Sequence, residues 1–356
     1  MDGRMSESEQ DILKEIKDRF QIAYDNDQNN YLDSLDDLNF ANGDQWPQDL
    51  AKDRASDGRP CLTINKIPTF ADQVIGDIRQ NEPSIKVKPV DSFADPKTAE
   101  ILGGLIRNIE NCSNAEVAYD TAVESAAMCG IGAWKLRTRY ANDTGFEQEI
   151  YIRRVKNPFT INWDPASQDW DHTDAKYCFE TEKIPKEEFE RLWPKASLSA
   201  FQGGRDRNPY WGDDRNIRIV TYWKVVQTSE KLYLVQSLVN GQQLVLPSLP
   251  QDRENWSVKK ERDVESHKIT VYKAIQTEIL EEPQDWAGRY IPIVMVYGKE
   301  LNIEGRTVYR GVVRHAKDPQ RLYNYSRSMS AEVISLAPKS PYLVTAKMIA
   351  NYQPIW

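Results

Sequence analysis

The chain has 356 residues, of which 40% are hydrophobic and 28% charged, and its formal net charge is −8 at pH 7. This composition excludes wholesale disorder, and the length predicts one elaborate domain or about two. The negative charge excludes a protein whose whole surface collects nucleic acid, so contact with DNA has to be local or weak. The four cysteines lack metal-ligand spacing, and no apolar run approaches the ~20 residues that cross a bilayer. We therefore expect reduced thiols and no membrane partner.

The chain begins with a polar helix. Over residues 6–39 the apolar side chains recur at helical spacing but form only a narrow face, which predicts a helix lying on a neighbour. Aspartate and asparagine accumulate near residues 25–30, and we expect the helix to break there. Turn-forming glycines and prolines follow at residues 42–47 and 57–60.

Three more helices are predicted before residue 130. An amphipathic helix begins at Ile67 and ends before Pro83, and residues 85–88 then alternate apolar and lysine side chains like a short edge strand. Asp95-Pro96 is a cap followed by proline at the first helical position, which predicts a third helix. Small residues dominate residues 115–129, so the fourth helix can approach a neighbour closely.

From Ala133 the apolar period changes from helical to two, which predicts a long β-rich region. Asn240-Gly241 between two apolar runs predicts a tight hairpin, because both central positions of that turn need positive φ. A short helix is expected at residues 185–193. Beyond the first strand, further strands are expected at residues 147–155, 217–226, 231–239, 243–246 and 269–280. The fold class is therefore α+β.

The last predicted elements are a strand and a helix. The apolar run at residues 290–297 is typical of a strand covered on both faces, although Pro292 argues against a central position early in it. Asp318-Pro319 predicts the start of a helix that ends at Pro338. Its apolar stripe consists of Leu322, Tyr325, Met329, Val333 and Leu336.

Alternate residues of the first strand carry cations, at Lys135, Arg137 and Arg139. Three cations two residues apart form a candidate phosphate-binding stripe. The returning strand offers Glu147 and Glu149 as cross-strand partners, and this pairing is the favoured interpretation.

Two acidic segments are candidate cation sites. Residues 25–36 partly imitate a calcium loop, but Asn30 stands where the turn glycine belongs and Asp36 where the long glutamate belongs. Asp164, Asp169, Asp171 and Asp174 form a second cluster, for which turn-forming hydrogen bonds to the backbone are favoured over a metal. None of the three histidines has a nucleophile in a recognisable context, and phosphate-cradling glycine loops are absent. We therefore predict no catalytic, cofactor-binding or metal-ligating residue and no cofactor.

Cations also gather before and along the last predicted helix. They are expected to face DNA or an acidic neighbouring subunit, or to form a solvated helix face. These candidate residues are Arg314, Lys317, Arg321 and Arg327.

Several stretches, taken in order, resemble the portal proteins of tailed bacteriophages, in particular the large portal family of short-tailed phages. The most specific are the run at residues 290–297 and the segment 308–314 that leads into Asp318-Pro319. The others are residues 37–46, 130–136, 162–165 and 171–175. The resemblance covers nearly the whole chain.

This resemblance implies a non-enzymatic ring, typically of twelve copies, at one capsid vertex of the virion, assembled in the host cytoplasm. Double-stranded DNA would pass through it without sequence preference during packaging and ejection. Its partners would be further copies of itself, the terminase large subunit, capsid and scaffolding proteins, and tail or adaptor proteins. Leu322, Tyr325, Met329 and Val333 would make stem packing or oligomer contacts.

The resemblance also implies a division of the chain. Residues 1–312 would form a wing-like domain, helical over 6–130 and β-rich over 131–312, and residues 313–338 the first stem helix. Residues 339–356 would begin a clip-like region, and because family members continue further, the sequence is expected to be incomplete. Two other interpretations remain open: a metal-dependent nuclease that processes phage DNA, and a virion adaptor or scaffold-binding protein.

Overall fold

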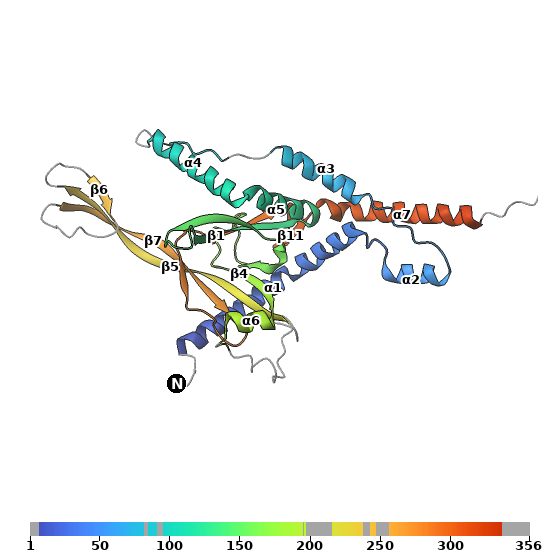
Figure 1. Ribbon diagram of the computed structural model, residues 1–356, viewed down its shortest axis with the longest axis horizontal. Coiled ribbons are helices and arrows are strands. Elements are labelled where there is room, and N and C mark those ends of the chain that lie inside the picture. The colour runs from blue at the N-terminus through green and yellow to red at the C-terminus, as the bar shows by residue number, and fades with distance from the viewer. Residues whose placement is uncertain are drawn as a thin grey trace, which may run out of the picture. The chain divides into compact units, whose positions relative to one another are not determined.

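Figure 1 shows a computed structural model of the chain. The chain divides into two compact units whose segments interleave along the sequence. Helices and antiparallel sheets both contribute, which confirms the α+β class. The structure describes residues 7–81, 85–90, 95–194, 196, 216–237, 243–246 and 256–336. The first unit comprises residues 1–32, 84–123 and 132–296, and the second comprises residues 33–83, 124–131 and 297–356.

A six-stranded antiparallel sheet forms the centre of the first unit, in the order β3-β4-β5-β7-β8, with β6 paired to β5. Alternation places Tyr177 and Phe179 on one face of the sheet and Cys178 on the other, as the two-residue period requires. The strands are β3 (Ile161–Trp163), β4 (Tyr177–Pro185), β5 (Asn216–Ser237), β6 (Gln243–Leu246), β7 (Trp256–Ala274) and β8 (Gln284–Trp286).

The N-terminal part of α1 (Glu7–Asn42) covers one face of this sheet, where Ile16 and Phe20 pack against Phe179. The predicted break near residues 25–30 is wrong, because α1 is continuous. Tyr31 donates a hydrogen bond to the carbonyl of Ile161, so contacts with β3 hold the helix where local propensity is poor.

A second sheet, β2-β1-β9, packs on the opposite face of the six-stranded sheet. Ala133 of β1 points into the core between the sheets, whereas Trp134 packs against α4 (Pro96–Ser113) and α5 (Ala115–Cys129). The side chain of Asp95 accepts from the Lys97 N–H, which confirms the predicted cap of α4. The strands are β1 (Ile131–Tyr140), β2 (Gln148–Arg154) and β9 (Ile293–Tyr297), and η1 (Pro158–Thr160) and α6 (Lys186–Leu192) complete the unit.

Three strand predictions need correction. The two strands expected at residues 217–226 and 231–239 are one continuous strand, β5, over residues 216–237. Residues 85–90 form no strand. β9 is not covered on both faces, because Val294 is 37% exposed while Ile293 is buried. The turn expected at Asn240-Gly241 lies outside the described residues.

The second unit is built around α7 (Val312–Leu336). Val313 packs with Phe40, Ala41 and Ile67 in a small core. The remaining elements of this unit are α2 (Gln48–Ser56), α3 (Ile67–Gln80), β10 (Lys299–Ile303) and β11 (Arg306–Arg310). The sequence did not predict α2 or the β10–β11 hairpin.

Close backbone contacts fix where α7 begins. Gly130 has φ +95°, and an added Cβ there would lie 2.7 Å from the Arg310 nitrogen. A Cβ on Gly311, directly before α7, would lie 2.2 Å from the Met128 carbonyl oxygen. Both positions therefore require glycine, since the obstructing atoms belong to the backbone.

Candidate functional site

The helix α7, which carries the predicted stem residues, begins at Val312 and not at Asp318. Pro319 lies inside the helix, so the prediction that it occupies the first helical position is wrong. A proline here removes one backbone hydrogen bond. The residues around it supply anchoring side chains, described next, that hold the helix through this point.

One face of α7 carries a ladder of buried polar side chains, Gln320, Asn324 and Ser328. They accept hydrogen bonds from alternate backbone N–H groups of residues 61–66, a segment outside helices and strands that we call the strap. The bonds are Lys66 N–H to Gln320 Oε1 (3.2 Å), Ile64 N–H to Asn324 Oδ1 (3.0 Å) and Leu62 N–H to Ser328 Oγ (2.9 Å).

The ladder works because two periods coincide. Four helical residues rise about 6 Å, and two extended residues advance about 6.6 Å. A polar residue at every fourth helical position therefore meets every second residue of the strap. Gln320 also donates to the Ile64 carbonyl at 2.8 Å, so the helix completes backbone pairing that a strand would otherwise provide.

The C-terminal end of the ladder is closed by an ion pair. Arg54, which is buried, donates to Glu332 at 3.0 Å and to the Pro60 carbonyl at 3.1 Å. Its guanidinium also lies over the rings of Trp46 and Tyr325, at 5.8 and 5.6 Å from their centroids. This pair continues the four-residue spacing, because Glu332 follows Ser328 by four residues.

Two of the predicted cations anchor the N-terminal half of α7 within the chain. Arg314 donates to Asp37 at 2.8 Å and to Asp33 at 3.0 Å, both on the C-terminal part of α1. The buried ammonium of Lys317 pairs with the same Asp37 at 2.6 Å and with Asp36. Burial works against the charged form of Arg314, but these carboxylates outweigh it and raise its pKa.

The other two predicted cations are exposed. Arg321 lies over the Phe40 ring at 5.2 Å and pairs with Asp318 at 3.4 Å, and Arg327 lies over the Tyr323 ring at 5.1 Å. Pairs of this kind are screened and contribute little to stability. Their positive charges remain accessible on α7.

The predicted apolar stripe of α7 is exposed in the single chain. The exposed fractions are 67% for Leu322, 42% for Tyr325, 38% for Met329 and 63% for Val333. Tyr325 also packs at a tilt on Trp46, with centroids 6.4 Å apart, so part of its ring is used within the unit. One face of α7 is therefore polar and hydrogen-bonded to the strap, and another is apolar and exposed to solvent.

The cation stripe of β1 lies in the interface between the two sheets of the first unit. Lys135 and Arg137 both pair with Glu180 of β4, and only Arg139 pairs with the predicted Glu149, at 2.6 Å. Burial lowers the pKa of Lys135, although Glu180 opposes this. The three cations are paired with carboxylates, as the pairing interpretation expects, but the cross-strand partner is present only for Arg139. Lys135 and Arg137 pair with Glu180, and Glu147 pairs with none of the three.

The acidic segment after β3 forms turns. Asp164 accepts from the Ala166 and Lys176 N–H groups, and Asp174 accepts from the Gln168 N–H and from the Ser167 hydroxyl at 2.7 Å. Within the described residues, no group of three or more potential metal ligands is arranged to hold an ion.

The same segment places a serine next to a histidine, which the sequence analysis did not predict. Ser167 Oγ lies 2.8 Å from His172 Nδ1 and also donates to Asp174. Because the hydroxyl proton is directed to the carboxylate, the imidazole donates to Ser167 and is not positioned as its base. His172 is stacked on Trp163, 4.4 Å between centroids, and burial lowers its pKa. The contacts among Ser167, His172 and Asp174 therefore stabilise the loop after β3.

The comparison with protein families identifies the class of protein. The family model described as phage P22-like portal protein matches residues 17–356, so the chain belongs to this family of phage portal proteins. The family is structural and not enzymatic. The sequence resemblance is thereby confirmed.

One relative is the portal protein of Acyrthosiphon pisum secondary endosymbiont phage 1, which is 25% identical over 309 residues. The match covers 83% of this chain and 43% of that protein, so the chain spans less than half the length of this curated relative. Among the helices of the described ranges, none is long and apolar enough to cross a membrane.

Proposed function

We propose that copies of this protein assemble through head-to-tail contacts into a closed ring, with twelve copies as the expected number, at one capsid vertex of the virion. Residues 1–312 would serve as the wing-like region and residues 313–338 as the first stem helix, and residues 339–356 would begin the clip. Assembly would take place in the host cytoplasm.

The exposed apolar stripe of α7 carries this proposal. Isolated exposed apolar residues are ordinary, but here four at helical spacing share one helix whose other face is anchored by the ladder. Because α7 is already anchored, less conformational entropy is lost when its exposed face binds a partner. The occupant we propose for the stripe is the neighbouring copy of the chain.

The ring would serve as a conduit for double-stranded DNA during packaging and ejection, and would dock the terminase large subunit, capsid and scaffolding proteins, and tail or adaptor proteins. A net charge of −8 favours the passage of DNA through the ring without binding, because the negative charge of the protein repels the DNA phosphates. Of the four predicted cations, Arg321 and Arg327 suit a role facing DNA or a neighbouring subunit. Arg314 and Lys317 are occupied by Asp33, Asp36 and Asp37.

The test is a double substitution, Met329→Asp with Val333→Asp, in the full-length gene product. Two charges on the stripe would have to be buried unpaired in the assembly, so the ring should fail to form. Native mass spectrometry measures the assembly state. The matched control is Phe146→Asp with Trp170→Asp, which introduces the same charges at side chains that are 93% and 77% exposed on loops. Rings that survive the α7 change would contradict the role of the stripe.

The nuclease interpretation receives no support from the described side chains. Lys135 and Arg137, two cations of the candidate phosphate-binding stripe, are neutralised by Glu180. Magnesium- or manganese-dependent cleavage of DNA by the purified protein would revive it.

A further inference from the structure

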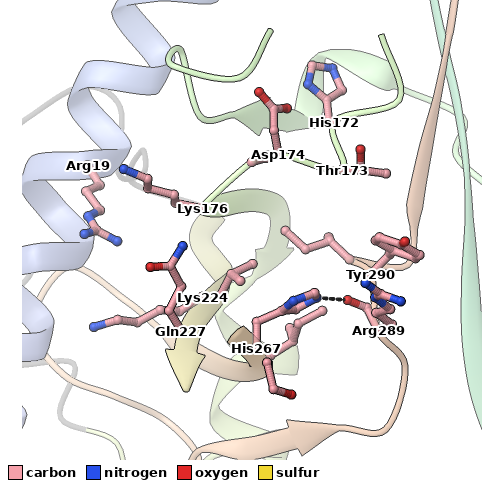
Figure 2. A pocket seen from close by; sticks show the side chains of 15 residues that line it. Arg19, His172, Thr173, Asp174, Lys176, Lys224, Gln227, His267, Arg289 and Tyr290 are labelled. Atoms are coloured by element: carbon pink, nitrogen blue, oxygen red, sulfur yellow. Dashed lines mark hydrogen bonds between the residues drawn. The ribbon is translucent and has the colours of Figure 1, made fainter. Parts of the chain in front are cut away.

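The first unit contains a pocket that the assembly role does not use. Its volume is about 430 Å³, and it lies between α1, the loop after β3, the strands β5 and β7, and the loop before β9. Figure 2 shows side chains that line it, with Arg19 and Lys176 on one side of the view and Arg289 and Tyr290 on the other. The cationic and ring-bearing residues considered below are Arg19, Lys176, Lys224, His267, Arg289 and Tyr290.

Four cations line the pocket, and they differ in how far they are neutralised. Arg19 and Lys224 share one carboxylate, Glu15, at 2.8 and 2.7 Å. Burial raises the pKa of Glu15, but the Lys224 hydrogen bond and Arg19 outweigh it, and the net shift is downward, so Glu15 is ionised at neutral pH. Lys176 and Arg289 form no ion pair with any residue the structure describes.

Among the described residues that line the pocket, Asp174 is the one carboxylate, and its oxygens already accept from Ser167 and from backbone N–H groups. Four cations against Asp174 and Glu15 leave a formal charge of about +2. The net charge of the whole protein is −8, so this pocket is a locally positive surface on a negatively charged protein.

The wall of the pocket is held in place by a hydrogen bond. His267 Nε2 donates to the Arg289 carbonyl oxygen, which ties the loop before β9 to β7 (Figure 2). Tyr290, which is 51% exposed, lies at the same loop and forms an aromatic rim. Arg289 is thus positioned by its backbone, and its guanidinium lies over the Tyr290 ring, 5.6 Å from the centroid, without an ion pair to any described residue.

We propose that this pocket binds a terminal phosphate group, that is, a phosphate monoester or inorganic phosphate. Such a group carries about −1.5 to −2 charges at neutral pH, which matches the excess charge of the pocket. An internal phosphodiester or a single carboxylate carries only one charge. Arginine offers a fork of donors to phosphate oxygens and lysine a point charge, and the pocket supplies both.

Three sources share this chemistry: inorganic phosphate, a mononucleotide, and the 5′ end of a DNA strand. The pocket volume falls in the range that holds small ligands. The aromatic rim at Tyr290 adds a surface on which a base can stack. Continuous duplex DNA is disfavoured, because the net negative charge of the chain repels the polymer.

The experiment titrates the protein at pH 7.5 and constant ionic strength with sodium phosphate, deoxyadenosine monophosphate, deoxyadenosine, and 5′-phosphorylated or 5′-hydroxyl oligonucleotides, by isothermal calorimetry. We expect saturable binding of probes that carry a terminal phosphate and none of the others. Equal affinity for phosphate and the nucleotide would indicate recognition of phosphate alone. Preference for the phosphorylated oligonucleotide would identify a DNA end.

Variants then locate the site. Lys176→Gln and Arg289→Gln should each weaken binding about tenfold or more, since each removes one charge-assisted contact without leaving a carboxylate unpaired. Lys176→Arg should retain binding. Lys156→Gln removes the same charge from an exposed position outside the pocket and should have no effect.

The proposal is overturned if no terminal phosphate binds, or if Lys156→Gln weakens binding as much as the pocket variants do. It is also overturned if an acidic peptide binds to the pocket and phosphate does not, which would make the pocket a protein-docking site. The outcome is independent of ring formation, because the pocket residues lie in the first unit and α7 in the second.

Discussion

Replacing Ser328 by alanine isolates one rung of the ladder between α7 and the strap. Ser328 is fully buried, and its hydroxyl accepts the Leu62 N–H at 2.9 Å. Alanine nearly preserves the volume but leaves the N–H without a partner. An unpaired buried donor costs about 1–3 kcal/mol. Because the strap is held by a few bonds only, this cost should appear as local opening.

Hydrogen exchange at single-residue resolution measures that opening directly. Each 1.4 kcal/mol corresponds to about a factor of ten in the opening equilibrium, so the Leu62 amide should exchange about five to a hundred times faster in Ser328→Ala. Asn324→Ala should have a larger effect, about 3–5 kcal/mol, because Asn324 also bonds Gln320 and Gln45.

Ser330→Ala is the matched control for this experiment. Ser330 is an exposed serine of the same helix, and its hydroxyl bonds only the Ser326 carbonyl of its own helix, at 2.9 Å. Its replacement should change Leu62 exchange by less than about a factor of two. Equal exchange in Ser328→Ala and Ser330→Ala would refute the ladder as the element that holds the strap.

Two further predictions concern a glycine and a buried carboxyl. Gly311→Ala should lower the melting temperature by several degrees, because its Cβ would overlap the Met128 backbone. Gly76→Ala, in a helix with nothing within 4 Å, should be neutral or stabilising; a similar loss at both sites would contradict this reasoning. Burial raises the pKa of Asp27 to about 6, against hydrogen bonds from the side-chain amides of Asn162 and Asn26 that lower it. The folded state therefore holds this proton more tightly than the unfolded chain, so the contribution of Asp27 to stability is fully present below about pH 4 and declines by up to about 3 kcal/mol as pH rises through 6. Asp27→Asn should remove that fall, raising the melting temperature at pH 8 and not at pH 4; an equal change at both pH values would refute the shift.

Local signals predicted the elements well where the chemistry is local. The cap at Asp95, the alanine-rich helix at 115–129 and the alternation from Ala133 all correspond to observed elements. Asp318-Pro319 was misleading for the same reason: it satisfies a local rule for a helix start. The helix instead begins at Val312, six residues before Asp318. It directly follows Gly311, which packs closely against the Met128 backbone.

The ladder and the partner of the cation stripe could not be predicted from periodicity. Gln320, Asn324 and Ser328 have the composition of a solvated helix face, and only the strap, more than 250 residues away in sequence, makes them buried. Glu180 likewise reaches Lys135 from a different sheet. One usable signal was present: three uncharged polar residues repeat at four-residue spacing.

Negative-stain imaging of the full-length gene product tests most directly whether this protein forms a portal ring. We expect closed rings with a central hole, in a single copy number near twelve. Monomers, or open filaments without a hole, at concentrations where the protein is folded would contradict it.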